Sequence, residues 1–175
     1  MQPRVLVLNG GSSSGKSTLT VALQRALPGV WLRFGVDVLV DACPPNLLAG
    51  DGLVLAAAVQ VGESYTAVED TWLAGLARMA ELGTRLLVED NFVSGPAAQQ
   101  RWRSALGSVP AAFVGVRCPA EVAARRELRR GDRITGMAAQ QAESVHQGIE
   151  YDLELDTAVA GPEQNAALVR ARFFG

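Results

Sequence analysis

The chain has one lysine, one histidine and two cysteines in 175 residues, and these scarcities exclude several classes of protein. A guanine-specific switch normally carries an Asn-Lys-x-Asp element, which a chain whose only lysine is Lys16 cannot build. Cys43 and Cys118 lie outside any Cys-x-x-Cys pair, and no second histidine supports His146, so a Cys/His metal site is not expected. We expect both cysteines to be reduced structural thiols.

Long apolar runs and an excess of basic charge are also missing. No run reaches the length of a membrane-spanning helix, and the N-terminal residues lack the basic region, apolar stretch and cleavage site of a secretion signal. A formal net charge of −2 leaves no bulk positive charge to attract nucleic acid. We therefore expect a cytoplasmic protein without a membrane or nucleic-acid partner, folded as one domain over residues 1–175. The oligomeric state stays open.

Short apolar runs alternate with segments of helical periodicity along the chain. Runs bounded by Gly, Pro or Asp predict buried strands, with a polar edge strand last, at Arg4–Leu8, Val30–Phe34, Arg85–Val88, Ala111–Val116 and within Tyr151–Thr157. Helical spacing, with Pro or Gly at several ends, predicts helices at Leu19–Leu27, Ser64–Leu82, Pro96–Leu106, Pro119–Arg130, Met137–Gln147 and Pro162–Phe173. This alternation favours an α/β fold with a parallel sheet, helices on both faces and a ligand site at the carboxyl ends of the strands.

Periodicity also predicts which side chains form the core. In the longest predicted helix, Val68, Trp72, Leu76 and Met79 recur at helical spacing and predict its buried face. Trp102 is expected in the core as well.

A glycine- and serine-rich stretch follows the first predicted strand and opens the first predicted helix. Its letters GGSSSGKS match G-x-x-x-x-G-K-[ST] at every fixed position, in the strand–loop–helix context of a phosphate-binding loop. Glycines let backbone N–H groups turn inward around phosphates, and the helix N-terminus adds positive potential. The expected nucleotide-binding residues are Gly10, Gly11, Ser12, Ser13, Ser14, Gly15, Lys16, Ser17 and Thr18.

Within this loop, Lys16 is expected to bridge the β- and γ-phosphates of ATP, and Ser17 to bind Mg²⁺. Every other basic residue of the chain is arginine, so the one lysine stands where the loop needs a compact ammonium on a flexible stem. A glycine-serine turn that holds no ligand is the alternative, and the flanking strand and helix argue against it.

Two sets of acids are candidates for metal binding and proton transfer. The strand Leu86–Val88 ends in Glu89 and Asp90, the form of a Walker B element, and either acid could hold the metal, directly or through water. A carboxylate that caps a loop is the alternative there. Asp37 follows the second predicted strand and could accept the proton of a substrate hydroxyl and direct its oxygen to the γ-phosphate. Alternatively, Asp37 caps a helix that two prolines then end.

An arginine-rich segment, RRELRRGDR, begins at Arg125. Arg130 and Arg133 flank a glycine, so we expect a mobile lid at about residues 129–137 that brings arginine to the transferring phosphoryl group. For Arg125 and Arg126 we expect a solvated helix face with acidic neighbours.

Together these stretches resemble the chloramphenicol phosphotransferase family, small P-loop kinases related in fold to adenylate and shikimate kinases. The resemblance covers about Val5 to Thr157 and rests on LNGGSSSGKS, WLRFGVD, VED, QQRWRS, VGVRC and RGDRITGMAAQQAESVHQGIEYDLELDT. It implies a three-layer fold with a five-stranded parallel sheet, helices on both faces and an arginine-bearing lid. It also implies ATP- and Mg²⁺-dependent transfer of the γ-phosphoryl group to the primary hydroxyl of chloramphenicol, which inactivates the antibiotic. By the same resemblance Asp37 is the base, and Arg133 is a lid residue that stabilises phosphoryl charge.

The acceptor site is expected at about residues 37–65, which include the long aperiodic segment Pro44–Glu63. Its apolar content, with Phe34, Tyr65 and Phe92 near it in sequence, suits an aromatic or apolar acceptor such as chloramphenicol or a similar alcohol. Two alternatives stay open: a kinase of the same fold for another small metabolite or nucleotide sugar, and an adenine-nucleotide-binding regulator that hydrolyses ATP slowly.

Overall fold

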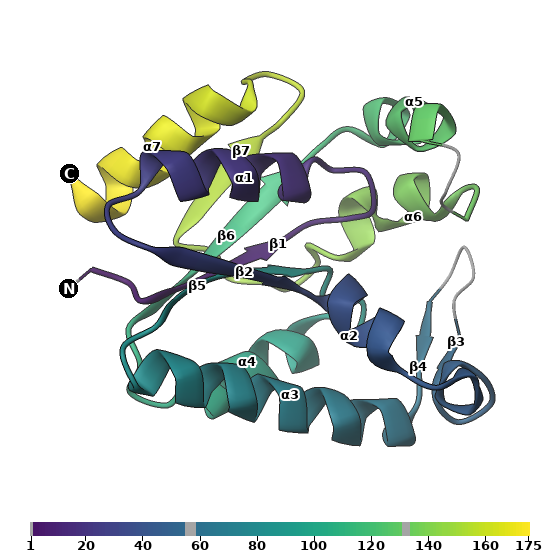
Figure 1. The fold of residues 1–175 in the computed structure, drawn as a ribbon. Helices are drawn as coiled ribbons and strands as arrows, with labels where there is room; N and C mark the ends of the chain where they lie inside the picture. Colours follow the sequence, from purple (N-terminus) through teal and green to yellow (C-terminus); the bar gives the residue numbers. More distant parts are fainter. Residues whose placement is uncertain (1, 55–58, 131–133) are drawn as a thin grey trace.

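The computed structural model describes residues 2–54, 59–130 and 134–175 (Figure 1). At its centre lies a five-stranded sheet in the order β2-β5-β1-β6-β7, in which every pairing is parallel. The strands are β1 (Val5–Asn9), β2 (Trp31–Gly35), β5 (Arg85–Asp90), β6 (Ala111–Arg117) and β7 (Leu153–Asp156). The α/β class, the parallel sheet and the edge position of β7 are therefore confirmed.

The helices also follow the periodic segments. They are α1 (Lys16–Ala26), α3 (Glu63–Glu81), α4 (Pro96–Leu106), α5 (Ala120–Arg130), α6 (Met137–Ser144) and α7 (Pro162–Phe174). A further short helix, α2 (Val36–Ala42), follows β2 directly. Within the described ranges, no helix combines the length and the apolar composition needed to cross a lipid bilayer.

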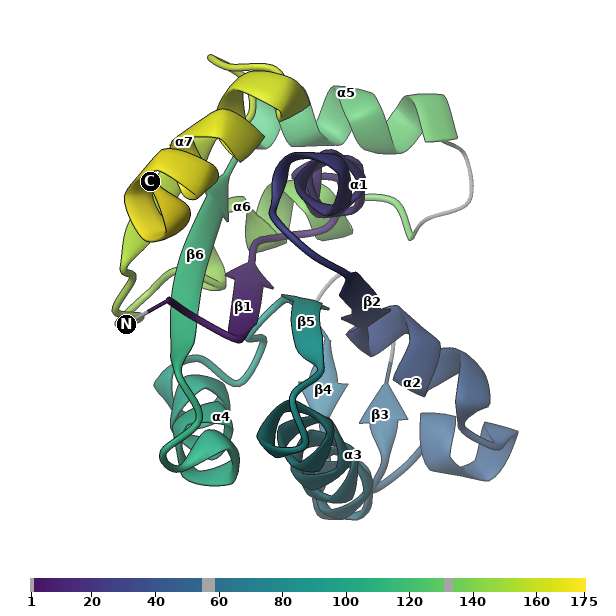
Figure 2. The same ribbon diagram turned by 60° about the vertical axis from the view of Figure 1, so that its left-hand side comes forward.

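Alternating side chains of the buried strands give the molecule its three layers. Leu6 and Leu8 of β1 pack in one core cluster with residues of α1 and α7. Val5 and Val7 point to the opposite face, where α3 and α4 cover the sheet. Figures 1 and 2 show the two pairs of helices on opposite sides of the strands. This arrangement follows from strand geometry, because successive side chains project to opposite faces.

The buried face of α3 matches the predicted one in part. Leu76 is buried, and Trp72 and Met79 pack against the core, but Val68 is exposed. The buried face also includes Tyr65, Glu69 and Leu73, and the apolar pattern missed this part because it contains an acid. Trp102 is buried as predicted, and both cysteines are free thiols.

The segment Pro44–Glu63 contains more regular structure than its lack of periodicity suggested. It forms a 3₁₀ turn, η1 (Pro45–Leu48), and an antiparallel pair of short strands, β3 (Leu53–Val54) and β4 (Gln60–Val61). A small core cluster that includes Leu39, Leu53 and Tyr65 joins this segment to α2 and α3. The segment is thereby held beside the carboxyl ends of the strands, where α2, α5 and α6 also lie (Figures 1 and 2).

Candidate active site

A cavity of about 1020 Å³ lies at the carboxyl ends of β1, β2 and β5. On one side, here called the phosphate-loop side, it is lined by residues 11–19 with parts of α5 and α6. The other side, here called the α3 side, consists of α2, the β3–β4 hairpin, α3, residues 91–94 and α4. Residues from distant parts of the sequence therefore share one cavity because parallel strands present their carboxyl ends at one edge of the sheet.

Lys16 opens α1 and reaches back across the loop that precedes it. Its Nζ donates hydrogen bonds to the carbonyl oxygens of Gly10 and Gly11, at 2.5 and 2.9 Å. A Cβ at residue 10 would lie 2.5 Å from the carbonyl oxygen of Val116, so the close approach of β1 to β6 requires glycine there. The ammonium is thus held inside the loop, at the N-terminal end of a helix.

The remaining loop residues suit an anion. Gly15 has a φ of 98°, a left-handed conformation that turns the chain into α1. The hydroxyl oxygens of Ser12, Ser13 and Ser14 are buried, and no described residue forms a hydrogen bond with them. Buried polar atoms without partners cost stability, and phosphate oxygens would supply the missing acceptors.

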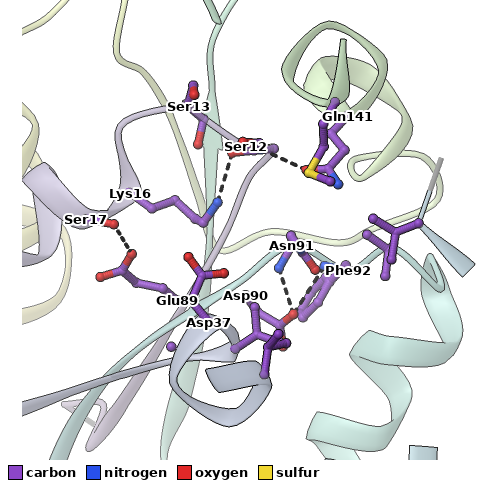
Figure 3. A pocket seen from close by; sticks show the side chains of 18 of the residues that line it. Ser12, Ser13, Lys16, Ser17, Asp37, Glu89, Asp90, Asn91, Phe92 and Gln141 are labelled. Atoms are coloured by element: carbon purple, nitrogen blue, oxygen red, sulfur yellow. Dashed lines mark hydrogen bonds between the residues drawn. The ribbon is translucent and has the colours of Figure 1, made fainter. Parts of the chain in front are cut away.

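Glu89 contacts the phosphate loop directly. Its Oε2 accepts a hydrogen bond from Ser17 Oγ at 2.6 Å (Figure 3). Its Oε1 accepts one from Thr20 Oγ1 at 2.6 Å. Glu89 therefore points to the face of the sheet that α1 covers, with its carboxylate beside the hydroxyl of Ser17.

Asp90 points the other way, because it is the next residue on the same strand. Its Oδ2 accepts a hydrogen bond from Trp102 Nε1 at 2.6 Å. Its Oδ1 accepts bonds from the backbone amides of Asn91 and Phe92 (Figure 3). Burial raises the pKa of this carboxyl group. Asp90 thus holds the loop after β5 and anchors α4 rather than facing Ser17.

Asp37 lies in the first turn of α2, and its side chain is exposed to the cavity. The helix begins after Gly35, which makes no side-chain cap, so the alternative in which Asp37 caps this helix is wrong. β5 separates β2 from β1, yet Asp37 and the phosphate loop still meet at the shared edge of the sheet. Figure 3 shows the Asp37 carboxylate pointing toward the end of the Lys16 side chain, while Glu89 beside them points to Ser17.

Two arginines of α5, Arg125 and Arg126, differ in their surroundings. Arg125 is exposed as expected, but Arg126 is half-buried and lines the cavity. Its guanidinium donates to the carbonyl oxygens of Ser14 and Thr157, at 3.2 and 2.9 Å. The expectation of a solvated Arg126 is therefore wrong, because this side chain ties α5 to the phosphate loop.

The predicted lid, residues 129–137, falls partly beyond the described ranges. Arg129 is exposed and lines the cavity. Arg133 lies outside the described residues, as does the side chain of Arg130. Their proposed role in the lid stays a prediction.

Two polar residues tie α6 to its surroundings. The buried carboxylate of Glu127 accepts hydrogen bonds from the backbone amides of Gly136 and Ala138, both at 2.8 Å, and so caps the N-terminus of α6. Gln141 Oε1 accepts a bond from the amide of Ser12 at 2.8 Å (Figure 3). The phosphate loop is therefore connected to α5 through Arg126 and to α6 through Gln141.

The α3 side of the cavity holds a buried acid. Glu69 is 8% exposed, pairs with Arg101 of α4, and lies one helical turn after Tyr65. Burial and, less strongly, the nearby Asp90 raise the pKa of Glu69 to about 7, while Arg101 opposes the shift.

His146 lies outside this cavity. It is buried, and its Nδ1 accepts a hydrogen bond from Tyr151 Oη at 2.6 Å, since Asn9 Nδ2 already donates to that oxygen. Burial lowers the pKa of His146 to about 4, so the ring is neutral and structural near pH 7.

The model of the family described as chloramphenicol phosphotransferase-like protein matches residues 3–174. The chain belongs to this family. A Mycobacterium tuberculosis (strain H37Rv) protein with the provisional name of O-phosphotransferase is 32% identical over 168 residues, which cover 88% of this chain and 75% of that protein.

Solved structures similar to this chain are P-loop kinases in fold. A sugar kinase from Janibacter sp. HTCC2649 superposes with a TM-score of 0.70 at 19% identity, over 97% of this chain and 93% of the kinase. The Mycobacterium tuberculosis APS kinase, in complex with AMPPNP and APS, superposes with a TM-score of 0.61 at 18% identity, over 99% of both chains. These likenesses show the fold.

Several site residues of this family member escaped the sequence analysis. Arg126 and Glu127 lie three and four residues after the buried Ala123, so they share its face of α5. Glu69 similarly shares a face with Leu73 and Leu76. Polar residues at apolar helical positions are the signal that could have found them. Gln141 carries the same signal, because it shares a face of α6 with the buried Met137 and Ala138. Its partner, a backbone amide distant in sequence, could not be predicted.

Proposed function

We propose that this protein is an ATP-dependent O-phosphotransferase that moves the γ-phosphoryl group of ATP to a hydroxyl of a small molecule. The primary hydroxyl of chloramphenicol is the first candidate, on the strength of the family. The observation that carries the proposal is the meeting of a Lys16-bearing phosphate loop and the Asp37 carboxylate in one cavity. Catalysis of phosphoryl transfer consists mainly of positioning the reactants and stabilising charge. A lysine that neutralises the phosphates and a carboxylate that orients the acceptor hydroxyl supply these two functions.

In the proposed reaction, residues 10–18 hold the triphosphate and Lys16 neutralises charge on the β- and γ-phosphates. Asp37 accepts the proton of the acceptor hydroxyl. The hydroxyl oxygen then bonds to the γ-phosphorus as its bond to the β–γ bridging oxygen breaks, which releases ADP. The predicted lid at about residues 129–137, with Arg130 and Arg133, closes over this site, and residues 37–65 form the acceptor site.

Mg²⁺ is part of the proposal, and the donors present fit it. Ser17 Oγ and Glu89 Oε2 are hard oxygen ligands held 2.6 Å apart at the loop. In the described ranges no three His, Cys, Asp or Glu side chains gather as a metal site. Mg²⁺ in kinases needs only one or two protein oxygens besides phosphates. Bound there, the ion would neutralise charge that develops on the phosphates. We assign Ser17 and Glu89 as its ligands and leave Asp90 a structural role.

Substitution of the two strand-end acids separates these roles. Glu89→Gln should raise the Mg²⁺ concentration needed for half-maximal ATP turnover by about tenfold, because it removes one charged oxygen ligand. Asp90→Asn should instead lower the free energy of unfolding by about 2 kcal/mol, because it leaves buried donors poorly paired. Titration of ATP turnover with Mg²⁺ checks the first effect and thermal unfolding checks the second, each measured on both variants. Reversed effects would make Asp90 the metal ligand.

Mass spectrometry of the product tests the proposed function. After incubation with ATP, Mg²⁺ and chloramphenicol, we expect the antibiotic to gain one phosphoryl group. ADP release should depend on the acceptor. Equal ATP hydrolysis with and without any acceptor would favour the regulator instead. Much faster transfer to shikimate, a sugar or a nucleoside monophosphate would show that the acceptor, but not the reaction class, is wrong.

A further inference from the structure

Tyr65 presents an unsatisfied polar atom on the α3 side of the cavity. It lines the cavity, its side chain is 1% exposed, and within the described ranges its Oη has no hydrogen-bond partner. Burial raises the pKa of this hydroxyl, so it stays protonated and can donate. A buried hydroxyl without a partner is destabilising, and a ligand that fills the cavity can supply the missing bond.

Glu69 stands beside Tyr65 on the same face of α3, because four residues make about one helical turn. Its carboxyl group lines the cavity and contacts Arg101. The same guanidinium also pairs with Asp70 through Nε, at 3.2 Å. Two carboxylates therefore share one guanidinium, and its charge is compensated.

The charges around this side disfavour an anionic ligand. Among the described residues that line the α3 side, Arg101 is the one cation, whereas Asp37, Asp41, Glu69 and Asp90 are acids. The neighbouring strand β2 adds one further cation to the cavity, Arg33. A carboxylate or phosphate bound here would meet acids without an uncompensated cation to pair with, which is unfavourable in a partly desolvated site. An uncharged group with hydrogen-bonding capacity meets no such penalty.

We propose that Tyr65 and Glu69 recognise the acceptor by hydrogen bonds to an uncharged polar group, such as an amide or a second hydroxyl, distant from the hydroxyl that is phosphorylated. Apolar neighbours in the same wall, including Val40, Leu53 and Phe92, hold the rest of the acceptor. This inference rests on the proposed function and adds the residues that select the acceptor. With a pKa near neutrality, Glu69 can accept from an N–H or donate to a carbonyl oxygen.

Steady-state kinetics with chloramphenicol as the probe test this pair. Tyr65→Phe should raise KM for chloramphenicol by about 3- to 10-fold, the loss of one neutral hydrogen bond. Glu69→Gln should raise it by about 5- to 50-fold, because a charge-assisted bond is stronger. For both variants kcat and KM for ATP should change less than about twofold, since neither residue lies on the phosphate-loop side.

Asp70→Asn is the matched control, because Asp70 also pairs with Arg101 but is half exposed and does not line the cavity. It should leave KM for chloramphenicol unchanged. If Glu69→Gln fails to fold, Tyr65→Phe alone still decides. An active wild-type protein whose variants keep the same KM overturns the inference but leaves the proposed function intact. A wild-type protein that phosphorylates none of chloramphenicol, shikimate, a sugar and a nucleoside monophosphate overturns both. Preferred transfer to the uncharged sugar moves the same KM comparison to that compound, whereas preferred transfer to shikimate or a nucleoside monophosphate, which are anions, overturns the inference and leaves the reaction class intact.

Discussion

Asp37→Asn is expected to lower phosphoryl transfer by about two to four orders of magnitude, the usual range for acid–base assistance, while ATP binding stays near normal. Asparagine keeps the shape of the side chain but cannot take the proton of the acceptor hydroxyl. Asp37 faces the cavity from the first turn of α2 and points toward Lys16 (Figure 3). Initial rates of product formation and calorimetric titration with ATP measure the two quantities separately.

Asp41→Asn provides the control for the loss of one negative charge from α2. Asp41 lies one turn further along the same helix, and its replacement should change the rate by less than about threefold, as expected of an exposed charge. Transfer that stays normal in Asp37→Asn would exclude Asp37 as the base and leave it a role in positioning at most.

Lys16→Ala is expected to weaken ATP binding by about 10- to 100-fold, the value of a hydrogen bond to a charged group, and to abolish measurable turnover. The Lys16 ammonium is already held by the carbonyl oxygens of Gly10 and Gly11, so it needs little reorganisation to meet phosphate. Its removal deletes positive charge where the triphosphate is expected, so both the affinity for ATP and the stabilisation of the transition state decrease. Calorimetry in the presence of Mg²⁺ and a sensitive ADP assay check the two effects.

Lys16→Arg distinguishes charge from shape. Arginine keeps the positive charge, but its planar fork cannot sit within a loop that closes around a compact ammonium, so turnover should still be lost. Arg25→Ala, near the other end of α1, should bind ATP normally. Normal ATP affinity in Lys16→Ala would contradict the phosphate-loop assignment.

The order and type of the main elements could be predicted because each signal is local. Apolar runs such as Leu86–Val88 are bounded by turn residues, and helices such as α4 begin at a proline. The face of α3 could be predicted only in part, since Leu76 is buried as expected but Glu69 occupies a buried position that apolar patterns skip. Segment Pro44–Glu63 was also missed, because its two-residue strands are too short to show a period.

Candidate site residues that lie at a strand end or in a loop could be predicted from the sequence. Asp37 and Glu89 both follow apolar strands, and the structure brings both to the phosphate loop. Arg126 and Gln141 were not accessible as ligands of the loop, because their partners are backbone atoms of Ser14 and Ser12 more than a hundred residues away. A polar residue at a buried helical position can be recognised in the sequence, but its distant partner cannot.

The sequence by itself determined the phosphate loop, because a strand, a turn of glycine and serine, and a helix with Lys16 at its start form from consecutive residues. Backbone conformation there depends on neighbours in the chain. Only the tertiary structure decided which strand-end acid meets Ser17. Glu89 and Asp90 must point to opposite faces of the sheet, but which face α1 covers depends on how the whole chain crosses over. The same packing placed Tyr65 and Glu69 in the cavity wall, because a helix face becomes a binding surface only when another element leaves space opposite it.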